Sequence, residues 1–414
     1  MFTIMDSIYI KRHVIELRDK MRLLHLTFLP SKSLWGGGER FIYNLKYYLN
    51  LYYRNLYKIY EISFQNFNSD SYSYSFIDSI LKTLLNKVQR SRILRDITMP
   101  FRIIRAVDVI CKFTSKIYVS DIIHIHHIDF LTMLPYIKTK NKTVLYTLHW
   151  SPFDLPNELR GYILHPHIYI TYFRHLIRHV DAITVFSIYH YNLISNVYSK
   201  HKIYITPQSI DLKPFMNLPP KNSSRSLLNL PMSKKLILFI GRLHKMKGVD
   251  ILIKAYASIE DRLRSLSKLL IVGSGPELFS LKRLVKKQLN IEDNVLFLGR
   301  VSDTHKRLLL RSCDIFILPS RYDVVPLTMI EALAAETPII APYYYAIPEY
   351  VKHRRNGLLF RPNDHYDLAQ KIEELLDNDS LRREISRNNS VDRLHYSWDK
   401  NIHLWHKVYQ ELST

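Results

Sequence analysis

Two stretches of the chain place charged residues beside glycine or proline at the end of an apolar run, a setting that suits phosphate binding. In the first, residues 238–248, an apolar run enters a turn bounded by Gly241 and Gly248. Arg242 and Lys247 put two cations in that turn, and these side chains bind diphosphates, Arg through a forked contact and Lys as a point charge. A solvated basic turn would look the same, so this stretch alone leaves both interpretations open.

The second stretch, residues 315–334, places two acids on either side of a proline. Asp323 precedes an expected helix and Glu331 lies about a turn and a half inside it, so the two acids can serve different parts of one extended ligand. Pro326 suits the first turn of that helix, whose free N–H groups and dipole favour a phosphate. For either acid alone, an ordinary structural role is the alternative.

The elements that must position these residues follow a repeating pattern of apolar strands and helices. Near-continuous runs of Val, Ile, Leu and Tyr separated by helical stretches indicate parallel sheets that are covered on both faces. The fold class is therefore α/β, with doubly wound parallel sheets. The predicted strands are residues 23–28, 57–62, 121–125, 143–148, 182–185, 236–240, 269–272, 295–298, 315–318 and 338–340.

A break rich in proline and serine, residues 207–235, separates the fifth predicted strand from the sixth. It predicts a boundary between two Rossmann-like domains that face each other across a cleft. We expect an extension at residues 1–20, a first domain at 21–210 and a second domain at 211–398. Ligands of such sheets bind beyond the carboxyl ends of the strands, so both charged stretches would face the cleft.

Composition limits the classes of partner. The 414 residues include 59 Lys and Arg against 37 Asp and Glu, a formal net charge of +22. This excess favours anionic partners such as phosphorylated substrates, an acidic membrane surface or nucleic acid. The two cysteines exclude a disulfide framework and a cysteine-based zinc site. No RNP-type or zinc-finger signature occurs, so no specific nucleic-acid partner is expected.

The Gly-Arg turn followed by the acid-x7-Glu helix resembles motifs of the GT-B glycosyltransferases of family 4, also described as glycosyl transferases group 1. The likeness covers nearly everything after residue 20. The resemblance implies a GT-B fold, in which the last helix, here residues 399–414, crosses back to complete the first domain. Other matching segments are residues 36–39, 121–126, 146–149, 181–187, 207–211, 271–276, 295–299, 337–341, 347–349 and 356–359.

The resemblance also implies a role for each matching residue. Arg242 and Lys247 would hold the donor diphosphate, Glu331 the ribose hydroxyls, and Asp323 and His149 would lie at the donor sugar. The implied catalytic residues are Asp323, His149, Arg242 and Lys247. The implied donor-binding residues are Gly37, Gly38, Gly241, Arg242, Lys247, Val325, Pro326, Leu327, Thr328 and Glu331.

The implied reaction moves a hexosyl group from a nucleotide-diphosphate sugar with retention of anomeric configuration. No metal and no cofactor are expected, because cations and a helix N-terminus would stabilise the leaving diphosphate.

The chain departs from the family pattern on the sugar side. Only 10 of its residues are Gly, and Ser209, Glu336, Tyr345 and Ala346 stand where the family often has glycine. Asp323 is one methylene shorter than the usual Glu, and Tyr345 would put a large ring where backbone amides often approach ligand. We therefore expect the phosphate clamp to be retained and the preference for the sugar to be altered.

Three histidines lie close together at the end of one predicted strand: His124, His126 and His127. Only two of them share a face, and no acid or third ligand sits at a matching spacing, so no metal site is expected. His175 and His179 form an i, i+4 pair without the intervening Glu of metalloproteases.

A basic segment favours a membrane-linked acceptor. Residues 77–88 carry an apolar stripe at helical spacing, and basic residues outnumber acids from there to Lys116. Such a helix can lie on an anionic membrane, although a core stripe with a solvated basic face is the alternative. We expect a glycan or lipid-linked acceptor, reached from the cytoplasm at the inner membrane face. The rival functions are transfer to a soluble small acceptor and nucleotide-sugar binding without useful turnover.

Overall fold

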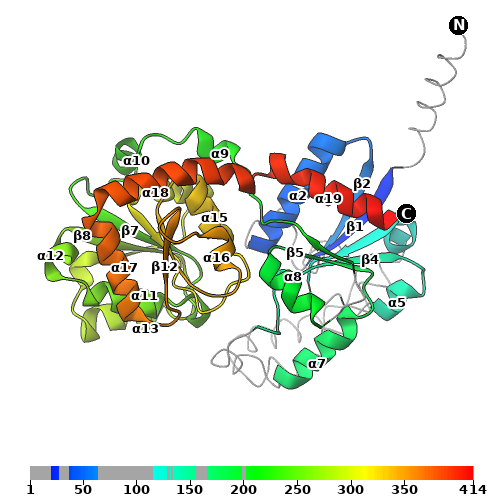
Figure 1. Cartoon of the computed structure of the whole chain (residues 1–414), viewed down its shortest axis with the longest axis horizontal. Coiled ribbons are helices and arrows are strands. Elements are labelled where there is room, and N and C mark those ends of the chain that lie inside the picture. The colour runs from blue at the N-terminus through cyan, green and yellow to red at the C-terminus, as the bar shows by residue number, and fades with distance from the viewer. Residues whose placement is uncertain are drawn as a thin grey trace, which may run out of the picture.

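The computed structural model describes residues 20–27, 37–63, 115–127, 131, 134–154, 166–197 and 202–413. Within these residues the chain forms two six-stranded parallel sheets, each in its own domain, that lie side by side (Figure 1). The strand orders are β2-β1-β3-β4-β5-β6 and β12-β11-β10-β7-β8-β9. The predicted α/β class with doubly wound parallel sheets is confirmed.

The first sheet takes its strands from the first half of the chain. They are β1 (Met21–Thr27), β2 (Tyr57–Ser63), β3 (Ile122–Ile125), β4 (Thr143–Thr147), β5 (Ala182–Val185) and β6 (Lys202–Ile205). The helices described in this half are α2 (Gly37–Tyr53), α5 (Leu134–Lys138), α7 (Pro166–Ile177) and α8 (Ile188–Ser195), together with a helical turn at residues 115–119.

The second sheet comprises β7 (Lys235–Ile240), β8 (Ser267–Val272), β9 (Val295–Gly299), β10 (Ile315–Ile317), β11 (Ile339–Pro342) and β12 (Gly357–Phe360). Its main helices are α9 (Lys213–Met216), α10 (Lys221–Leu227), α11 (Val249–Ser258), α12 (Asp261–Ser265), α13 (Leu278–Arg283), α14 (Asp303–Ser312), α15 (Leu327–Ala334), α16 (Ile347–Tyr350), α17 (His365–Asp377) and α18 (Asp379–Asp392). A 3₁₀ turn, η4 (Lys245–Lys247), precedes α11.

Burial of both sheet faces explains why the central strands read as continuous apolar runs. Along β7, Ile237 and Phe239 pack into one hydrophobic cluster, while Leu236, Leu238 and Ile240 pack into the cluster on the other face. Alternate side chains of one strand thus enter two cores, as a parallel sheet covered by helices requires.

The sequence prediction omitted β6 and β12. The first and last residues of β6 are exposed and its two central residues are only half-buried. This edge strand begins with a lysine and therefore lacks a fully apolar run. The other omitted strand, β12, begins on Gly357 and is four residues long. Both lie at the edges of their sheets.

The chain crosses between the domains twice, and the two crossings are hydrogen-bonded to each other. Helix α18 continues through a 3₁₀ turn, η7 (Arg393–Tyr396), into α19 (Trp398–Ser413), which lies against the first domain (Figure 1). The backbone N–H of Ile210 donates to the carbonyl of Tyr396 (2.9 Å), and that of Trp398 donates to the carbonyl of Ile210 (3.1 Å). Trp398 and Trp405 are fully buried beside Phe41 of α2, at ring distances of 5.2 and 5.4 Å.

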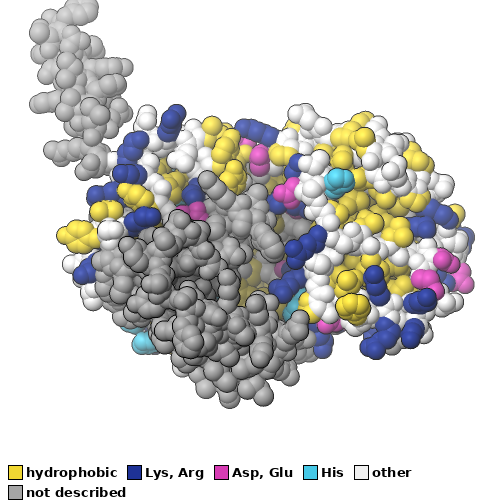
Figure 2. All heavy atoms as spheres, turned by 180° about the vertical axis from the view of Figure 1, so that it is seen from behind, with side chains coloured by type: hydrophobic (Ala, Val, Ile, Leu, Met, Phe, Trp, Pro, Cys, Tyr) yellow, Lys and Arg dark blue, Asp and Glu magenta, His cyan; other side chains and the backbone are white. Residues whose placement is uncertain are grey.

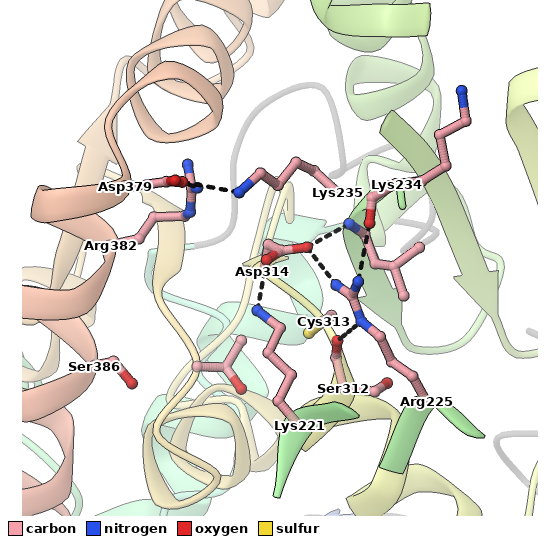
Figure 3. Close-up of polar contacts among 12 residues, drawn as sticks. Lys221, Arg225, Lys234, Lys235, Ser312, Cys313, Asp314, Asp379, Arg382 and Ser386 are labelled. Carbon is pink, nitrogen blue, oxygen red and sulfur yellow. Dashed lines mark hydrogen bonds and ion pairs between the residues drawn. The ribbon is translucent and has the colours of Figure 1, made fainter. Parts of the chain in front are cut away.

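A buried ion cluster fixes α10, the helix that leads into the second sheet (Figure 3). Asp314 accepts hydrogen bonds from Lys221 Nζ (2.5 Å), Arg225 Nη2 (2.6 Å) and the backbone N–H of Leu236 (2.7 Å). Burial alone would raise the pKa of Asp314, but the two cations and the backbone donor outweigh it and hold that pKa below its usual value. The cluster therefore ties α10 to β7 and β10.

Several expectations lie outside the described residues. These include the extension up to residue 19, Gly36 of the glycine-rich loop, and residues 77–114 of the basic segment. Among the described helices, none combines the length and the apolar composition needed to cross a bilayer.

Candidate functional site between the two domains

The two charged stretches meet at the carboxyl ends of neighbouring strands, β7 and β10. Lys247 Nζ lies 2.5 Å from Oδ1 of Asp323, and both side chains are partly buried. The sequence analysis gave these residues separate roles, in the diphosphate clamp and at the sugar. The structure places them in one ion pair.

Arg321 holds the two loops in this relative position. Its guanidinium donates to both carboxylate oxygens of Asp250 in α11 (2.8 and 2.7 Å) and to the carbonyl of Lys245 (2.8 Å). Burial would raise the pKa of Asp250, but the hydrogen bonds and charge of Arg321 outweigh it and lower that pKa. The bidentate pairing gives the loops a defined geometry, as expected for Arg and carboxylate.

Glycine is required at the end of the Lys247 turn. Gly248 has φ +63°, and a Cβ at this position would lie 2.0 Å from the carbonyl oxygen of Pro319. The turn therefore packs directly on the backbone that leads into the Asp323 loop. Gly248 therefore meets a backbone requirement that a residue with a Cβ could not meet.

Arg242 is the unengaged cation of the clamp. Its side chain is exposed, and it makes no hydrogen bond or ion pair with the described residues. The loop that carries it is held by backbone contact, because Leu243 N donates to the carbonyl of Ser274 (3.0 Å). The backbone at Arg242 is therefore held in place, while its guanidinium is exposed and available to bind a ligand.

Helix α15 begins beside the ion pair. Pro326 is its N-cap residue, one position before the first turn in which the sequence analysis placed it, and it gives the first-turn N–H groups no side-chain hydrogen bond. Leu327 and Thr328 open the helix, and Val325 precedes the cap. The start of α15 therefore keeps N–H donors available for an anion.

Glu331 is the most buried acid of the site, with 3% of its side chain exposed. Its Oε1 accepts hydrogen bonds from Lys306 Nζ (2.6 Å) and, more distantly, from Arg40 Nη1 (3.4 Å). Among the described residues, no partner contacts its Oε2 or Oδ2 of Asp323, although both oxygens are buried. Buried carboxylate oxygens without donors are costly, so this site has two acceptors suited to ligand hydroxyl groups.

Arg40, on α2 of the first domain, reaches the acids of the second domain and was missed by the sequence analysis. Its Nη2 donates to both oxygens of Asp303 (2.6 and 2.7 Å). Burial would raise the pKa of Asp303, but Arg40 and then Lys306 outweigh it and lower that pKa. Arg40 and Glu331 line a pocket of about 150 Å³ that also touches Asp211. Arg40 lies shortly after the glycine-rich loop in the sequence, and this position could have indicated that it belongs to the site.

Figure 2 shows where such charges gather on the surface. On the face seen from behind, lysine and arginine side chains lie along the boundary between the domains, with acidic side chains beside them.

His149 follows β4 and lies two positions before Ser151, whose carbonyl accepts a hydrogen bond from Tyr322 of the second domain. Phe41 and Phe186 pack against the ring of His149, with centroids at 5.1 and 5.4 Å. Its Nε2 lies 3.2 Å from Nδ1 of His126. Burial, with a smaller effect of His127, lowers the pKa of His149 to about 3, so this ring is neutral at physiological pH.

The expectation that no third histidine accompanies His124 and His126 was wrong. His25 on β1 is the register partner of His124 on β3, and ring nitrogens of all three lie within 4.8 Å of one another. Both ring nitrogens of His124 already have partners, Tyr409 Oη (2.8 Å) and Thr147 Oγ1 (2.6 Å). Sequence spacing could not reveal this cluster, because the third ring comes from another strand.

Tyrosines join the domains at the expected sugar end. Tyr322, next to Asp323, places its hydroxyl 2.8 Å from the carbonyl of Ser151 in the first domain. Tyr345 has φ +47° and packs against Tyr322 and Tyr189, with ring centroids at 5.7 and 5.6 Å. The position where the family often has glycine therefore does adopt a left-handed backbone, and a large aromatic residue occupies it.

Comparison with protein families finds a match in the second half of the chain. Residues 221–391, which include Arg242, Lys247, Asp323 and Glu331, match the family model described as glycosyl transferases group 1. Through this segment, which is less than half of the chain, the protein is similar to the glycosyl transferases group 1 family. The assignment to glycosyltransferase family 4 in particular stays a prediction.

Curated relatives agree with the group 1 assignment. An uncharacterised glycosyltransferase of Methanocaldococcus jannaschii is 32% identical over 196 residues, which are 47% of this chain and 49% of that protein. D-inositol 3-phosphate glycosyltransferase of Corynebacterium jeikeium is 28% identical over 217 residues, 51% of this chain and 52% of the relative. The chain thus spans about half the length of the curated relatives it matches.

Solved structures match the fold over nearly the whole chain. Sucrose-phosphate synthase from Thermosynechococcus elongatus superposes with a TM-score of 0.73 at 19% identity, covering 94% of this chain and 99% of that one. Anabaena HepE in complex with UDP-glucose gives a TM-score of 0.69 at 16% identity, covering 94% and 100%. At these identities the likeness concerns the fold, and it agrees with the GT-B arrangement expected for a group 1 protein.

Proposed function

We propose that this chain is a glycosyltransferase that takes a hexosyl group from a nucleotide-diphosphate sugar. The observation that carries the proposal is a pair of buried carboxylate oxygens, Asp323 Oδ2 and Glu331 Oε2, in the same site as Lys247 and Arg242. Neither oxygen has a hydrogen-bond donor in the part of the chain that the structure describes. Hydroxyl groups supply the donors that these oxygens need, and a diphosphate supplies the negative charge that the cations need. A nucleotide sugar carries both kinds of group.

The charges fit a reaction in which a diphosphate leaves. In an oxocarbenium-like transition state negative charge grows on the diphosphate, and fixed cations lower the barrier most where charge develops. Arg242, Lys247 and the open N-terminus of α15 are such groups. We propose that the reaction retains the anomeric configuration and needs no bound metal, as the family resemblance implies.

The proposed acceptor is a glycan or a lipid-linked glycan at the cytoplasmic membrane face. The support is the formal net charge of +22 and the basic segment that runs to Lys116. Sedimentation with anionic liposomes at low salt tests this part. We expect the protein to bind the liposomes, and we expect charge reversal at Arg90, Arg92 and Arg95 to weaken this binding. Equal binding of the wild type and the charge-reversed variant would contradict the proposal.

A second candidate is nucleotide-sugar binding without useful turnover. Two features favour it: Asp323 stands where the family usually has Glu, and Tyr345 occupies a position often held by glycine. Transfer to a soluble small acceptor is the rival within the enzyme class, and an acceptor screen separates it from the membrane-linked reaction.

The decisive experiment is a donor screen. UDP-sugars come first, because HepE was solved with UDP-glucose, and GDP-sugars second. We expect a matching donor to raise the melting temperature by mass action and to be hydrolysed or transferred. Glu331→Ala should lose both effects, whereas Glu374→Ala, which removes an acid from the surface of α17, should keep them. Equal turnover in wild type and Glu331→Ala would defeat the enzymatic proposal.

A further inference from the structure

A line of three histidine rings runs from the interior of the first domain to the site. His25 Nδ1 lies 2.8 Å from His126 Nε2, and His126 Nδ1 lies 3.2 Å from His149 Nε2. His25 is fully buried and His126 nearly so, whereas the His149 residue is only partly buried. The three rings belong to separate chain segments, the strand β1 and the ends of β3 and β4, so the sheet itself assembles the line.

All three rings are neutral at physiological pH. Burial and, less strongly, the charge of Lys46 lower the pKa of His25 to about 3. Burial, followed by the neighbouring histidines, holds the pKa of His126 well below its usual value. A neutral imidazole has one N–H and one acceptor nitrogen, so each hydrogen bond in the line fixes which nitrogen carries the proton.

The inner end of the line sets its direction. His25 Nε2 is buried and has no hydrogen-bond partner among the described residues. If the line donated inward, His25 would carry its proton on this nitrogen as a buried donor without an acceptor, which is the rarer kind of unsatisfied group. If it donates outward, the nitrogen holds only a lone pair. Outward donation places the proton on Nδ1 of His25, then of His126, and then of His149.

At the outer end of the line, this direction of donation leaves the proton of His149 on Nδ1. The Nε2 of His149 accepts from His126, and its Nδ1 makes no hydrogen bond with the described residues. Phe41 packs edge-on against this ring and restricts its rotation. The ring can therefore offer its Nδ1–H to an oxygen of a bound ligand.

We propose that His25 and His126 are positioning residues that hold His149 as its Nδ1–H tautomer, so that His149 donates a hydrogen bond to a substrate oxygen. This inference rests on the proposed function for the identity of the substrate, a nucleotide sugar or its acceptor. The tautomer itself is independent of any activity.

The converging nitrogens of His25, His124 and His126 raise a competing use, a metal site. A metal would have to displace either Tyr409 or Thr147 from His124, because each of these hydroxyls contacts one of its two ring nitrogens. It would also have to displace one of the two ring contacts of His126, either to His25 or to His149. The line of hydrogen bonds accounts for the observed contacts without such rearrangement.

Nitrogen NMR of the full chain labelled with ¹⁵N-histidine tests the proposal without an activity assay. Two-bond ¹H–¹⁵N correlations distinguish the two tautomers, and the signals of His149 are assigned by their loss in His149→Asn. We expect Nδ1 of His149 to be protonated in the wild type. Detection of the Nε2–H tautomer in the wild type overturns the proposal, and so does stoichiometric Zn²⁺ binding that is lost in His25→Leu.

Variants of His126 extend the test to catalysis. His126→Leu removes the donor to His149, whereas His126→Asn keeps an amide N–H that can replace it. We expect the Nδ1–H tautomer to be lost in the first and restored in the second, while His175→Leu on the exposed face of α7 leaves it unchanged. An unchanged tautomer in folded His126→Leu overturns the proposal.

The kinetic effect should follow the tautomer. In characterised metal sites, losing the partner of a functional imidazole costs about 10-fold to 100-fold in activity, and we expect a fall of that order in kcat/KM for His126→Leu, with recovery in His126→Asn. A tautomer that behaves as expected in a protein with no transfer activity would refute the proposed function and leave the histidine line intact.

Discussion

Lys247 Nζ and Asp323 Oδ1 form an ion pair of 2.5 Å at the carboxyl ends of β7 and β10. The residue expected to hold the diphosphate is thus bound to the residue expected at the donor sugar. A diphosphate that attracts Lys247 would release the Asp323 carboxylate to accept from a sugar hydroxyl. In the proposed function, this ion pair would couple binding of the phosphates to recognition of the sugar through one lysine.

Replacing Lys247 should reduce catalysis more than donor binding. Loss of one such electrostatic donor typically costs about 3 kcal/mol in the transition state, or roughly 100-fold in kcat. We expect that fall in steady-state kinetics of Lys247→Ala. Lys245→Ala is the matched control, because its side chain is exposed in the same turn, and a loss of similar size there would contradict the assignment.

Arg40→Ala should open the cleft without unfolding the protein. Ion pairs of partly exposed side chains contribute roughly 0 to 1 kcal/mol, so the melting temperature should change little. The contacts to Asp303 and Glu331 join the two domains, however, and their loss should increase the radius of gyration measured by small-angle X-ray scattering. Arg354→Ala breaks a pair with Glu374 within the second domain and should leave the radius unchanged.

Acidification should destabilise the first domain through its buried histidines. The pKa of His25 is about 3 in the folded chain against 6.5 for the ordinary side chain, so between these values the unfolded chain binds more protons. Stability then rises with pH, and each such histidine lowers the free energy of unfolding by up to about 1.4 kcal/mol per pH unit on acidification.

Urea titrations at pH 7, 6 and 5 measure this slope. We expect it to become shallower in His25→Leu, whereas His175→Leu should retain the wild-type slope. Stability that does not change over this range would show that the interior histidines titrate normally.

Tyr345→Gly should change donor preference. Its φ of +47° costs a non-glycine residue roughly 1 to 2 kcal/mol, so glycine relieves strain but removes the ring contacts with Tyr189 and Tyr322. We expect a broader range of accepted sugars in a donor competition assay, with Tyr343→Ala, an exposed neighbour, as the control. Identical sugar ranking in all three proteins would exclude Tyr345 from the specificity of the site.

Sequence patterns predicted the parts of the site that lie within one loop or helix. The strand and turn around Lys247 and the helix of Glu331 are local, so their periodicity and glycine positions sufficed. Arg40 and Asp303 lie 263 positions apart, and His25 and His126 lie 101 apart. Contacts over such separations depend on strand order and on how the domains face each other, which hydrophobic spacing does not encode.

The sequence showed which positions hold another residue where the family often has glycine, but it did not show the backbone strain at these positions. Glu336 and Tyr345 both adopt left-handed backbone, at φ +63° and +47°. Arg311 and Arg393 both pair with the carboxylate of Glu336, and aromatic contacts hold Tyr345. Each departure therefore has a local compensation that only three-dimensional neighbours reveal.

The hydrogen bonds that join Ile210 to Tyr396 and Trp398 tie the two chain crossings together, so the domains are connected by two bonded segments. A single linker would let the domains twist and slide in any direction, whereas two bonded chain crossings favour rotation about the line between them. We therefore expect the cleft between the domains to open and close mainly by that rotation.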